Sequence, residues 1–367
     1  MSLAQVDTAL YDQQLKAKAQ RITEQFQVFT PPALNVFSSA PSHYRMRAEF
    51  RIWHDDNRSY YRMFDPETKA PFNVTDFIAG SARIGELMPA LIDSISASSV
   101  LRHRLFQVEF LTTQKGEALV SLIYHKALNA HWADEAKRLQ HLLNIAIIGR
   151  SRKQKVVLKT DTVTETLHVA GQTYHYQQVE NSFTQPNAGV NEKMLAWASE
   201  CAQNSPGDLL ELYCGNGNFT CVLAQHFGKV LATEISKVSV NCARHNFRLN
   251  GIGNAEIARL SSEEFTQAMR GARQFRRLRD IDLNSYDFST VFVDPPRAGL
   301  DKGTEKLAQN FNRIIYVSCN PETLKKNLLT LGETHRIEKM ALFDQFPYTH
   351  HAEMGVYLIR TRHSRDA

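Results

Sequence analysis

The sequence predicts an α/β chain in two parts: an α+β domain with an antiparallel sheet over residues 1–180, and a doubly wound parallel-sheet domain over residues 181–367. Three observations favour this class. Short segments that alternate polar and apolar residues, as strands do, fill much of the first half. From about residue 181, strand and helix patterns alternate, an order that implies a parallel sheet with helices on both faces. A length of 367 residues is enough for two separate cores.

The first domain begins with an amphipathic helix and continues as a sheet. Residues 8–27 carry the helical pattern. Between about residues 44 and 179, segments such as 47–53 alternate polar and apolar side chains and predict strands. Two helical patterns, near 81–98 and 130–144, lie between these strands, so the expected fold of this domain is α+β.

The second domain alternates strands with helices. The expected strands are 208–213, 229–233, 290–293 and 313–317, and the expected helices are 219–226, 238–249 and 321–328. The last two segments, 336–343 and 355–360, lie close together in the sequence and predict an antiparallel pair at the end of the sheet. Because open α/β sheets bind ligands at the carboxyl ends of their strands, the residues that follow each strand are candidates for a site.

A cysteine follows one of these strands, in the sequence Ser-Cys-Asn-Pro at 318–321. Asn320 fits the N-cap and Pro321 the first position of the next helix. We expect Cys319 to face the positive end of the helix dipole, which lowers the pKa of a thiol and increases the thiolate fraction. The alternative is a buried cysteine that behaves as a small apolar residue.

A glycine turn follows the first strand of the second domain, in the sequence Tyr-Cys-Gly-Asn-Gly-Asn at 213–218. Its two glycines let the backbone approach a ligand closely. A dinucleotide fingerprint would need a third glycine where Thr220 stands, so pyrophosphate binding is disfavoured. Glu234 ends the next strand, where a carboxylate can accept hydrogen bonds from both hydroxyls of a ribose.

This arrangement resembles the class I S-adenosylmethionine-dependent methyltransferases, whose glycine turn holds the amino-acid end of the methyl donor and whose second-strand acid holds the ribose. The sequence Asp-Pro-Pro-Arg at 294–297 follows another strand and makes a rigid turn towards donor and substrate. In relatives that methylate amino groups, an aromatic residue follows the two prolines and stacks on the base. Arg297 stands there in this chain, which disfavours chemistry on an exocyclic amine.

Methylation of a pyrimidine carbon needs both a thiolate and a base. Carbon 5 of uracil is a poor nucleophile until a thiolate adds to carbon 6. A general base must then remove the surplus proton from carbon 5. Glu353, just before the last apolar segment, is the candidate base, although such an acid is often simply solvated. His350 and His351 are competing bases, or surface histidines.

The motifs follow the order seen in the RNA 5-methyluridine methyltransferases, and the similarity is strong over residues 181–360. The segments that carry this resemblance are 181–187, 211–218, 294–297, 318–323 and the His-x-Glu motif that ends at Glu353. The segment 42–53 looks like the bacterial tRNA branch of the family. Ribosomal relatives usually begin with a small β-barrel and a cysteine cluster for iron and sulfur, and no cysteine lies in the first 200 residues here.

The resemblance implies a role for each matching residue. Cys319 would be the nucleophile and Glu353 the base that removes the carbon-5 proton. The methyl donor would lie against Gln185, Tyr213, Asn218, Glu234 and Asp294, and Asp294 would also be near the uracil edge. The implied substrate is the T-loop uridine of tRNA, together with its equivalent in transfer-messenger RNA. The alternatives are a ribosomal uridine methyltransferase and a non-catalytic protein that binds or folds tRNA.

Basic residues interleaved with aromatic ones predict an RNA surface on the first domain. The net charge of +5 favours a polyanionic partner only weakly. Candidates for phosphate contacts are Arg45, Arg47 and Arg51, and candidates for stacking on bases are Trp53, Phe106 and His125. Two further basic runs, 150–155 and 270–279, are equally compatible with solvated faces, and each aromatic side chain is equally compatible with the core.

The composition disfavours several other classes. We expect no signal peptide and no membrane span, because no apolar stretch approaches about 18 residues. The five cysteines form no Cys-x-x-Cys pair, so neither a metal ion nor an iron–sulfur cluster is expected, and a reducing cytoplasm fits best. The chain is expected to be a monomer. We expect packing roles for Cys201, Cys214, Cys221 and Cys242.

Overall fold

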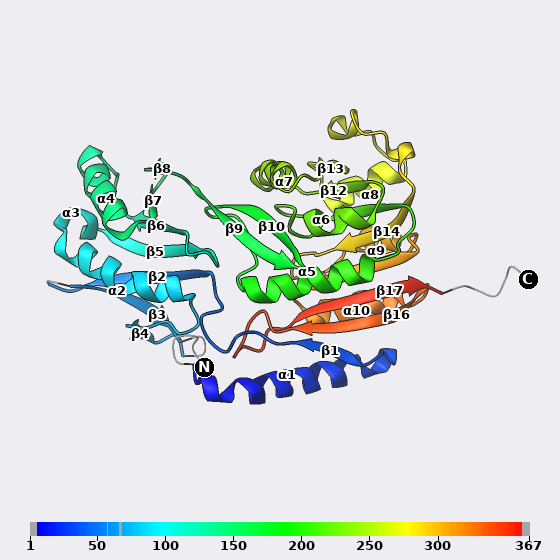
Figure 1. Cartoon of the computed structure of the whole chain (residues 1–367), viewed down its shortest axis with the longest axis horizontal. Coiled ribbons are helices and arrows are strands. Elements are labelled where there is room, and N and C mark those ends of the chain that lie inside the picture. Colours follow the sequence, from blue (N-terminus) through cyan, green and yellow to red (C-terminus); the bar gives the residue numbers. More distant parts are fainter. Residues whose placement is uncertain (1–5, 57, 66–67, 362–367) are drawn as a thin grey trace, which may run out of the picture. The chain divides into compact units, whose positions relative to one another are not determined.

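The computed structural model describes residues 6–56, 58–65 and 68–361, which fall into two compact units (Figure 1). The first unit comprises the residues up to Tyr11, Ala40–Thr166 and Gln177–Gly189. The second unit comprises Asp12–Ser39, Leu167–Tyr176 and the residues from Val190 onward. The sequence analysis expected a single boundary near residue 180, whereas each unit here is built from separate stretches of chain.

The first unit contains a seven-stranded sheet in the order β4-β3-β2-β5-β6-β7-β8. Its strands are β2 (Arg47–His54), β3 (Ser59–Phe64), β4 (Pro71–Val74), β5 (Leu105–Thr112), β6 (Ala118–Tyr124), β7 (Ala146–Ser151) and β8 (Gln154–Val157). Its helices are α2 (Ala82–Ala97), α3 (Ser99–Arg102) and α4 (Ala130–Leu143). Neighbouring strands are antiparallel except β6 and β7, which are parallel because α4 connects them as a crossover.

Alternation along β2 creates the core of this sheet. Ala48, Phe50 and Ile52 are buried, whereas the residues between them point to the other face. The Phe50 ring packs against those of Tyr61 and Phe110, which come from neighbouring strands. The predicted helices near 81–98 and 130–144 are confirmed as α2 and α4.

The second unit contains an eight-stranded sheet in the order β1-β16-β17-β15-β14-β11-β12-β13. Its strands are β1 (Leu34–Phe37), β11 (Asp208–Leu212), β12 (Val230–Thr233), β13 (Ala255–Ala258), β14 (Phe288–Val293), β15 (Arg313–Ser318), β16 (His335–Phe343) and β17 (Glu353–Arg360). Strands β11 to β15 are parallel to their neighbours in this group, and β17 runs antiparallel to β15 and β16. The predicted parallel sheet and antiparallel pair are confirmed, but β1 pairs with β16, so the pair does not form the end of the sheet.

Helices cover both faces of this sheet. They are α1 (Tyr11–Phe26), α5 (Ala188–Ala202), α6 (Asn218–Leu223), α7 (Lys237–Leu249), α8 (Ser262–Met269), α9 (Lys302–Ala308) and α10 (Pro321–Leu331). Residues of α1, α8, α9 and α10 share one apolar core with the sheet. On the other face, Trp197 of α5 packs against Phe343, and Phe219 of α6 packs against Phe292. The doubly wound arrangement is therefore confirmed.

The N-terminal helix packs in the second unit, although the sequence analysis assigned it to the first domain. Strand β1 pairs in parallel with β16, with Phe37 opposite Phe343 (Figure 1). Ile22 and Phe26 of α1 are fully buried in the same core. This contact depends on pairing between segments about 300 residues apart, which local sequence patterns do not encode.

The remaining elements are two strands of eight residues each and several 3-10 helices. Strands β9 (Thr162–Val169) and β10 (Gln172–Val179) form a two-stranded sheet. Short 3-10 helices cover Thr8–Leu10, Gln27–Phe29, Ala224–His226, Arg276–Leu278 and Leu283–Ser285. None of the helices in the described part of the chain has the length and apolar character needed to cross a membrane.

Candidate active site

Three chemically important side chains lie at the ends of three adjacent strands of the second unit. Asp294 follows β14, Cys319 follows β15, and Glu353 begins β17. The parallel strands β14 and β15 bring their carboxyl ends to one edge of the sheet. Strand β17 is antiparallel and starts at that edge, with Met354 opposite Ser318. Glu353 is therefore placed beside Cys319 by the register of the sheet.

The two carboxyl groups of this site are electrostatically linked. Burial raises the pKa of Glu353 well above its usual range, and the nearby Asp294 raises it further. Burial also raises the pKa of Asp294. Two carboxylates in one poorly solvated site repel each other, so the pair gives up its protons in coupled steps. At neutral pH the site therefore resists holding two full negative charges.

The expectation of a lowered pKa for the Cys319 thiol is wrong for this structure. Burial raises the pKa of Cys319 to about 11, the charges of Glu353 and Asp294 add to the effect, and Arg297 opposes it. The helix start itself is as predicted, because Asn320 is the N-cap and accepts a hydrogen bond from the Glu322 backbone N–H at 3.1 Å. Desolvation and two nearby carboxyls thus outweigh the helix dipole.

The other four cysteines are buried, as expected for packing residues: Cys201, Cys214, Cys221 and Cys242. Burial raises the pKa of Cys201 to about 12 and that of Cys242 to about 11. Cys319 is only half-buried. It is therefore the cysteine of this chain that a substrate can reach.

The glycine turn adopts a backbone that explains its glycines. Tyr213, Gly215 and Gly217 all have positive φ, at 62°, 56° and 80°. A Cβ atom on Gly217 would lie 2.7 Å from Cε1 of Phe247 on α7, too close for any contact between carbon atoms. Helix α6 begins directly after this turn, at Asn218. A side chain would therefore not fit at Gly217, whereas at Gly215 the space is open and only the positive φ favours glycine.

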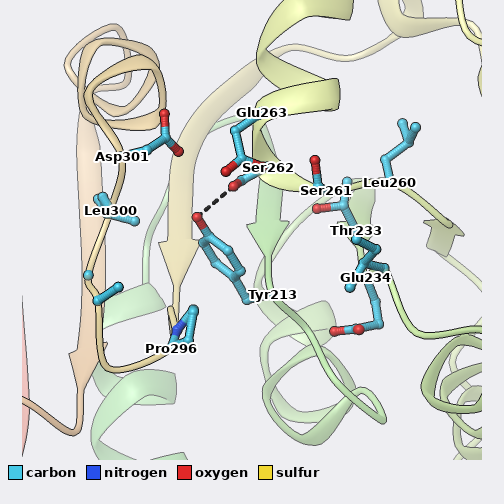
Figure 2. A pocket seen from close by; sticks show the side chains of 13 residues that line it. Tyr213, Thr233, Glu234, Leu260, Ser261, Ser262, Glu263, Pro296, Leu300 and Asp301 are labelled. Carbon is cyan, nitrogen blue, oxygen red and sulfur yellow. Dashed lines mark hydrogen bonds between the residues drawn. The ribbon is translucent and has the colours of Figure 1, made fainter.

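A pocket of about 380 Å³ opens beside this turn, within the size range of small-ligand sites (Figure 2). Figure 2 shows Tyr213 between Asp301 on one side and Glu234 on the other. The Tyr213 hydroxyl donates a hydrogen bond to the Ser262 hydroxyl at 2.6 Å. The pocket is lined by Tyr213, Thr233, Glu234, Ile235, Leu260, Ser261, Ser262, Glu263, Pro296, Ala298, Gly299, Leu300 and Asp301.

Backbone groups hold the Glu234 carboxylate at the edge of this pocket. One carboxylate oxygen accepts a hydrogen bond from the Gly215 N–H at 3.1 Å, and the other accepts one from the Ser236 N–H at 2.7 Å. Each oxygen has a second lone pair for a ligand hydroxyl. Ile235, next in the chain, is 65% exposed and adds an apolar surface to the pocket. A carboxylate beside an apolar surface suits a nucleoside, because the carboxylate can accept from the ribose hydroxyls and the apolar surface can pack against the base.

Three of the predicted donor-site residues, Gln185, Asn218 and Asp294, lie outside the pocket lining. The side-chain amide of Asn218 exchanges two hydrogen bonds with that of Asn191, at 2.9 and 3.0 Å. Gln185 is half-buried and belongs to the first unit. The sequence analysis missed Ser261 and Asp301, which line the pocket and cap α8 and α9. The capping-box pattern of Ser261 with Glu264 was a signal that could have found this helix start.

The Asp-Pro-Pro-Arg turn joins the pocket to the cysteine turn. Pro296 lines the pocket. The backbone carbonyl of Arg297 accepts hydrogen bonds from the Asn320 side chain at 3.0 Å and from the Thr323 hydroxyl at 3.2 Å. A ligand in the pocket and a substrate at Cys319 would therefore share this turn.

A buried acid lies beneath the glycine turn. Glu211 of β11 is completely buried, and among the described residues neither carboxyl oxygen has a hydrogen-bond partner. Burial raises the pKa of Glu211 to about 8, and Asp294 contributes in the same direction, while the neighbouring Thr220 offsets part of the shift. The carboxyl group is therefore largely protonated at neutral pH.

The predicted RNA contacts of the first unit fall into two groups. The Arg51 guanidinium lies 4.0 Å from the centre of the Phe106 ring, and the Phe106 and His125 rings are 4.2 Å apart. Trp53 is 51% exposed and lies under the guanidinium of Arg62, which the sequence analysis missed. These side chains, on β2, β3, β5 and just after β6, make a cationic and aromatic surface.

Arg45 and Arg47 differ from this surface in their environment. Burial lowers the pKa of both side chains. Arg45 donates a hydrogen bond to the Arg47 carbonyl at 2.8 Å, and Arg47 donates one to the Ser182 carbonyl at 2.6 Å. The basic run at 150–155 is partly neutralised, because Arg150 pairs with Glu180. Arg45 and Arg47 therefore bind backbone carbonyls, and Arg150 binds a carboxylate.

Comparisons with known proteins show the family to which the chain is similar. The family model described as tRNA (Uracil-5-)-methyltransferase matches residues 10–361. The chain is 55% identical over 364 residues to the tRNA/tmRNA (uracil-C(5))-methyltransferase of Shewanella amazonensis, covering 98% of this chain and 100% of that protein. It is 56% identical over 357 residues to the protein of the same name from Cellvibrio japonicus, covering 97% and 98%.

The fold has a counterpart among solved structures. The crystal structure of Pyrococcus abyssi tRNA (uracil-54, C5)-methyltransferase in complex with S-adenosyl-L-homocysteine matches with a TM-score of 0.72. The match covers 95% of this chain and 83% of that one, at 20% sequence identity. At this identity the similarity concerns the fold.

Proposed function

This chain belongs to the tRNA (uracil-5-)-methyltransferase family, and from that premise we propose how its residues act. The enzyme uses S-adenosylmethionine to methylate carbon 5 of uracil in tRNA and tmRNA. The observation that carries the proposed mechanism is the register of β15 and β17, which puts Glu353 beside Cys319. This proximity supports the proposal that Cys319 acts as the nucleophile and Glu353 as the base on one uracil ring.

The proposed reaction begins with addition of the Cys319 thiolate to carbon 6 of uracil. The electrons of the C5–C6 double bond move towards the carbonyl oxygen at position 4, and carbon 5 becomes nucleophilic. S-adenosylmethionine supplies the methyl group, as an electrophile on a cationic sulfur. Glu353 then removes the remaining proton from carbon 5. The electron pair left behind re-forms the C5–C6 double bond and expels the thiolate.

The residues of the pocket fit the methyl donor. Its volume of about 380 Å³ lies within the range of small-ligand sites. Glu234 would accept hydrogen bonds from the ribose hydroxyls, and Ile235 and Leu260 would pack against the adenine. The turn from Tyr213 to Gly217 would hold the amino-acid end. The predicted contacts of Asn218, Gln185 and Asp294 with the donor remain predictions.

RNA recognition is assigned to the first unit. We infer that it grips the T-arm while the second unit receives one extruded uridine. Extrusion from the stack costs a few kcal/mol, and stacking on aromatic side chains contributes roughly 1–3 kcal/mol per base. Arg51, Trp53, Phe106 and His125 are the candidates that the structure leaves accessible, while phosphate contacts by Arg45 and Arg47 remain predictions. A monomeric state and a cytoplasmic location also remain predictions.

The experiment uses a T-arm RNA with 5-fluorouridine at the target position. Fluorine cannot leave as a proton, so the enzyme and S-adenosylmethionine should yield a methylated covalent adduct that survives a denaturing gel. Cys319→Ser should form no adduct. With ordinary uridine, Glu353→Gln should accumulate the adduct, because the base is missing. If the unmodified enzyme binds the RNA but forms no adduct, the covalent mechanism is refuted and a non-catalytic role is favoured. If an adduct forms only with a ribosomal RNA fragment, the tRNA assignment is refuted.

A further inference from the structure

Arg297 is held from two sides next to the reactive cysteine. Its backbone carbonyl accepts hydrogen bonds from Asn320 and Thr323, at the start of the helix that follows Cys319. One nitrogen of its guanidinium lies 3.0 Å from Nδ1 and 3.2 Å from Nε2 of His351, in the loop that leads to Glu353. This side chain therefore connects the nucleophile turn to the segment that carries the base. Arg297 is exposed, so these contacts, and not burial, set its position.

The contact with Arg297 favours the neutral form of His351. The guanidinium is a cation, so a neutral imidazole can lie against it at this distance, whereas an imidazolium would be repelled. The groups that face His351 oppose its protonation. Partial burial lowers the pKa of His351, and the charges of His350, Arg297 and Lys18 lower it further. The His350 ring lies 4.2 Å from the His351 ring, and the Phe346 ring packs against it at 5.8 Å.

Helix α1 fixes the loop that carries His351. Lys18 donates hydrogen bonds to Asp344 at 2.6 Å and to the Phe346 carbonyl at 3.0 Å. Arg21 donates one to the His350 carbonyl at 2.8 Å. Strand β16 ends just before this loop, and β17 begins just after it. The loop therefore has little freedom to move His351 away from Arg297.

We propose that neutral His351 is a positioning residue that holds the Arg297 guanidinium beside the Cys319 thiol, and that protonation of His351 releases it. A fixed cation favours the thiolate and offsets the repulsion from Glu353 and Asp294. The use of this arrangement in catalysis rests on the proposed function. The arrangement itself is a property of the protein without RNA, so it can be tested separately.

The test measures how fast iodoacetamide alkylates Cys319 between pH 5 and pH 9, without RNA or methyl donor. Only the thiolate reacts, so a thiol with a fixed pKa well above this range loses reactivity tenfold per pH unit on acidification. Peptide mass spectrometry assigns the modified site. The four buried cysteines remain unmodified as long as the protein stays folded, so they report folding in the same experiment.

Three variants separate positioning from simple packing. In the unmodified protein, we expect the alkylation rate to fall by about a further tenfold, beyond the tenfold per pH unit, as His351 becomes protonated. A change of this size is expected when one nearby charge is lost. In His351→Asn, the side-chain oxygen still accepts from Arg297 but does not titrate, so the rate stays high and the extra drop disappears. In His351→Ala, the rate should be about tenfold lower throughout the range above the histidine transition. In the control His350→Asn, the extra drop remains and moves to higher pH, because one repelling ring is gone.

Two results would overturn the proposal. One is an equal alkylation rate in His351→Ala and the unmodified protein, and the other is an additional fall in the rate at acid pH that persists in His351→Asn. The methyl-transfer assay is run separately on the same variants. If alkylation behaves as expected and methyl transfer to T-arm RNA is absent in every form, the positioning holds and the proposed function fails. If the alkylation results fail while the 5-fluorouridine adduct still forms, the function holds and the positioning fails.

Discussion

The ion pair between Lys18 and Asp344 offers a quantitative test of how α1 is anchored. The two charged groups are 2.6 Å apart, and their side chains are only 3% and 0% exposed. Gln14 donates a further hydrogen bond to Asp344 at 2.8 Å. Burial lowers the pKa of Lys18 even though Asp344 opposes the shift, so desolvation outweighs attraction. The pair is therefore costly to break and contributes little net stability.

Lys18→Met should reduce the free energy of unfolding of the second unit by about 3–5 kcal/mol. It leaves the Asp344 carboxylate buried without its cation and removes a donor from the Phe346 carbonyl. The double variant Lys18→Met with Asp344→Asn should recover most of that loss, because no buried charge remains and the asparagine oxygen still accepts from Gln14.

Urea unfolding can be followed through Trp197, which lies in the second unit, whereas the other two tryptophans, Trp53 and Trp132, lie in the first. Replacing these two with phenylalanine makes the fluorescence specific to the second unit. A loss below about 1 kcal/mol in Lys18→Met would refute the reasoning, because a buried carboxylate without its cation must cost more than that. A double variant no more stable than the single one would also refute it, since the loss would then come from packing.

Three further predictions concern the turn, the buried acid and the RNA surface. Gly217→Ala should reduce the free energy of unfolding by about 1–3 kcal/mol more than Gly215→Ala does. Both positions have positive φ, but only at Gly217 would the added Cβ atom meet another side chain. Urea unfolding midpoints measure the two losses, and equal losses would contradict the prediction. Burial raises the pKa of Glu211 to about 8, so its ionisation should lower the free energy of unfolding by up to about 5 kcal/mol as pH rises from about 4.5 to 8. Glu211→Gln should therefore gain stability relative to the unmodified protein as pH rises from 5.5 to 8, and a gain independent of pH would contradict the assignment. Phe106→Ala should weaken binding of T-arm RNA by about 1–3 kcal/mol in fluorescence anisotropy, whereas the exposed Leu142 of α4 can be replaced by alanine without loss. Equal effects would count against the surface.

The parts of the site that the sequence predicted depend on local signals. The N-cap role of Asn320, the start of α10 at Pro321 and the glycine turn all follow from residues within a few positions of one another. The position of Glu234 after β12 follows from the strand pattern. Their joint placement at one edge then follows from the parallel order of the strands.

The rest of the site depends on contacts between distant segments. The pKa of Cys319 is set by burial and by carboxyls that lie 25 and 34 positions away along the chain. The direction of the Arg47 side chain is set by the carbonyl of Ser182, 135 positions away, which accepts a hydrogen bond from it. The packing of α1 in the second unit depends on pairing of β1 with β16. No local pattern reports any of these.

Burial raises the pKa of Cys319 most, and the geometry that the proposed reaction requires raises it further. The thiolate must reach carbon 6 and the base must reach a proton on carbon 5, and these two atoms are bonded neighbours in one ring. A nucleophile and a carboxylate that serve the same ring therefore lie close enough to repel each other, and the repulsion raises the pKa of both groups. Cations must offset this repulsion during the reaction. The chain itself provides one such cation, Arg297, and the methyl donor brings a second one, its cationic sulfur. The half-buried thiol is thus favoured as a thiolate when Arg297 and the cationic sulfur of the methyl donor both lie near it. Without them it stays largely protonated.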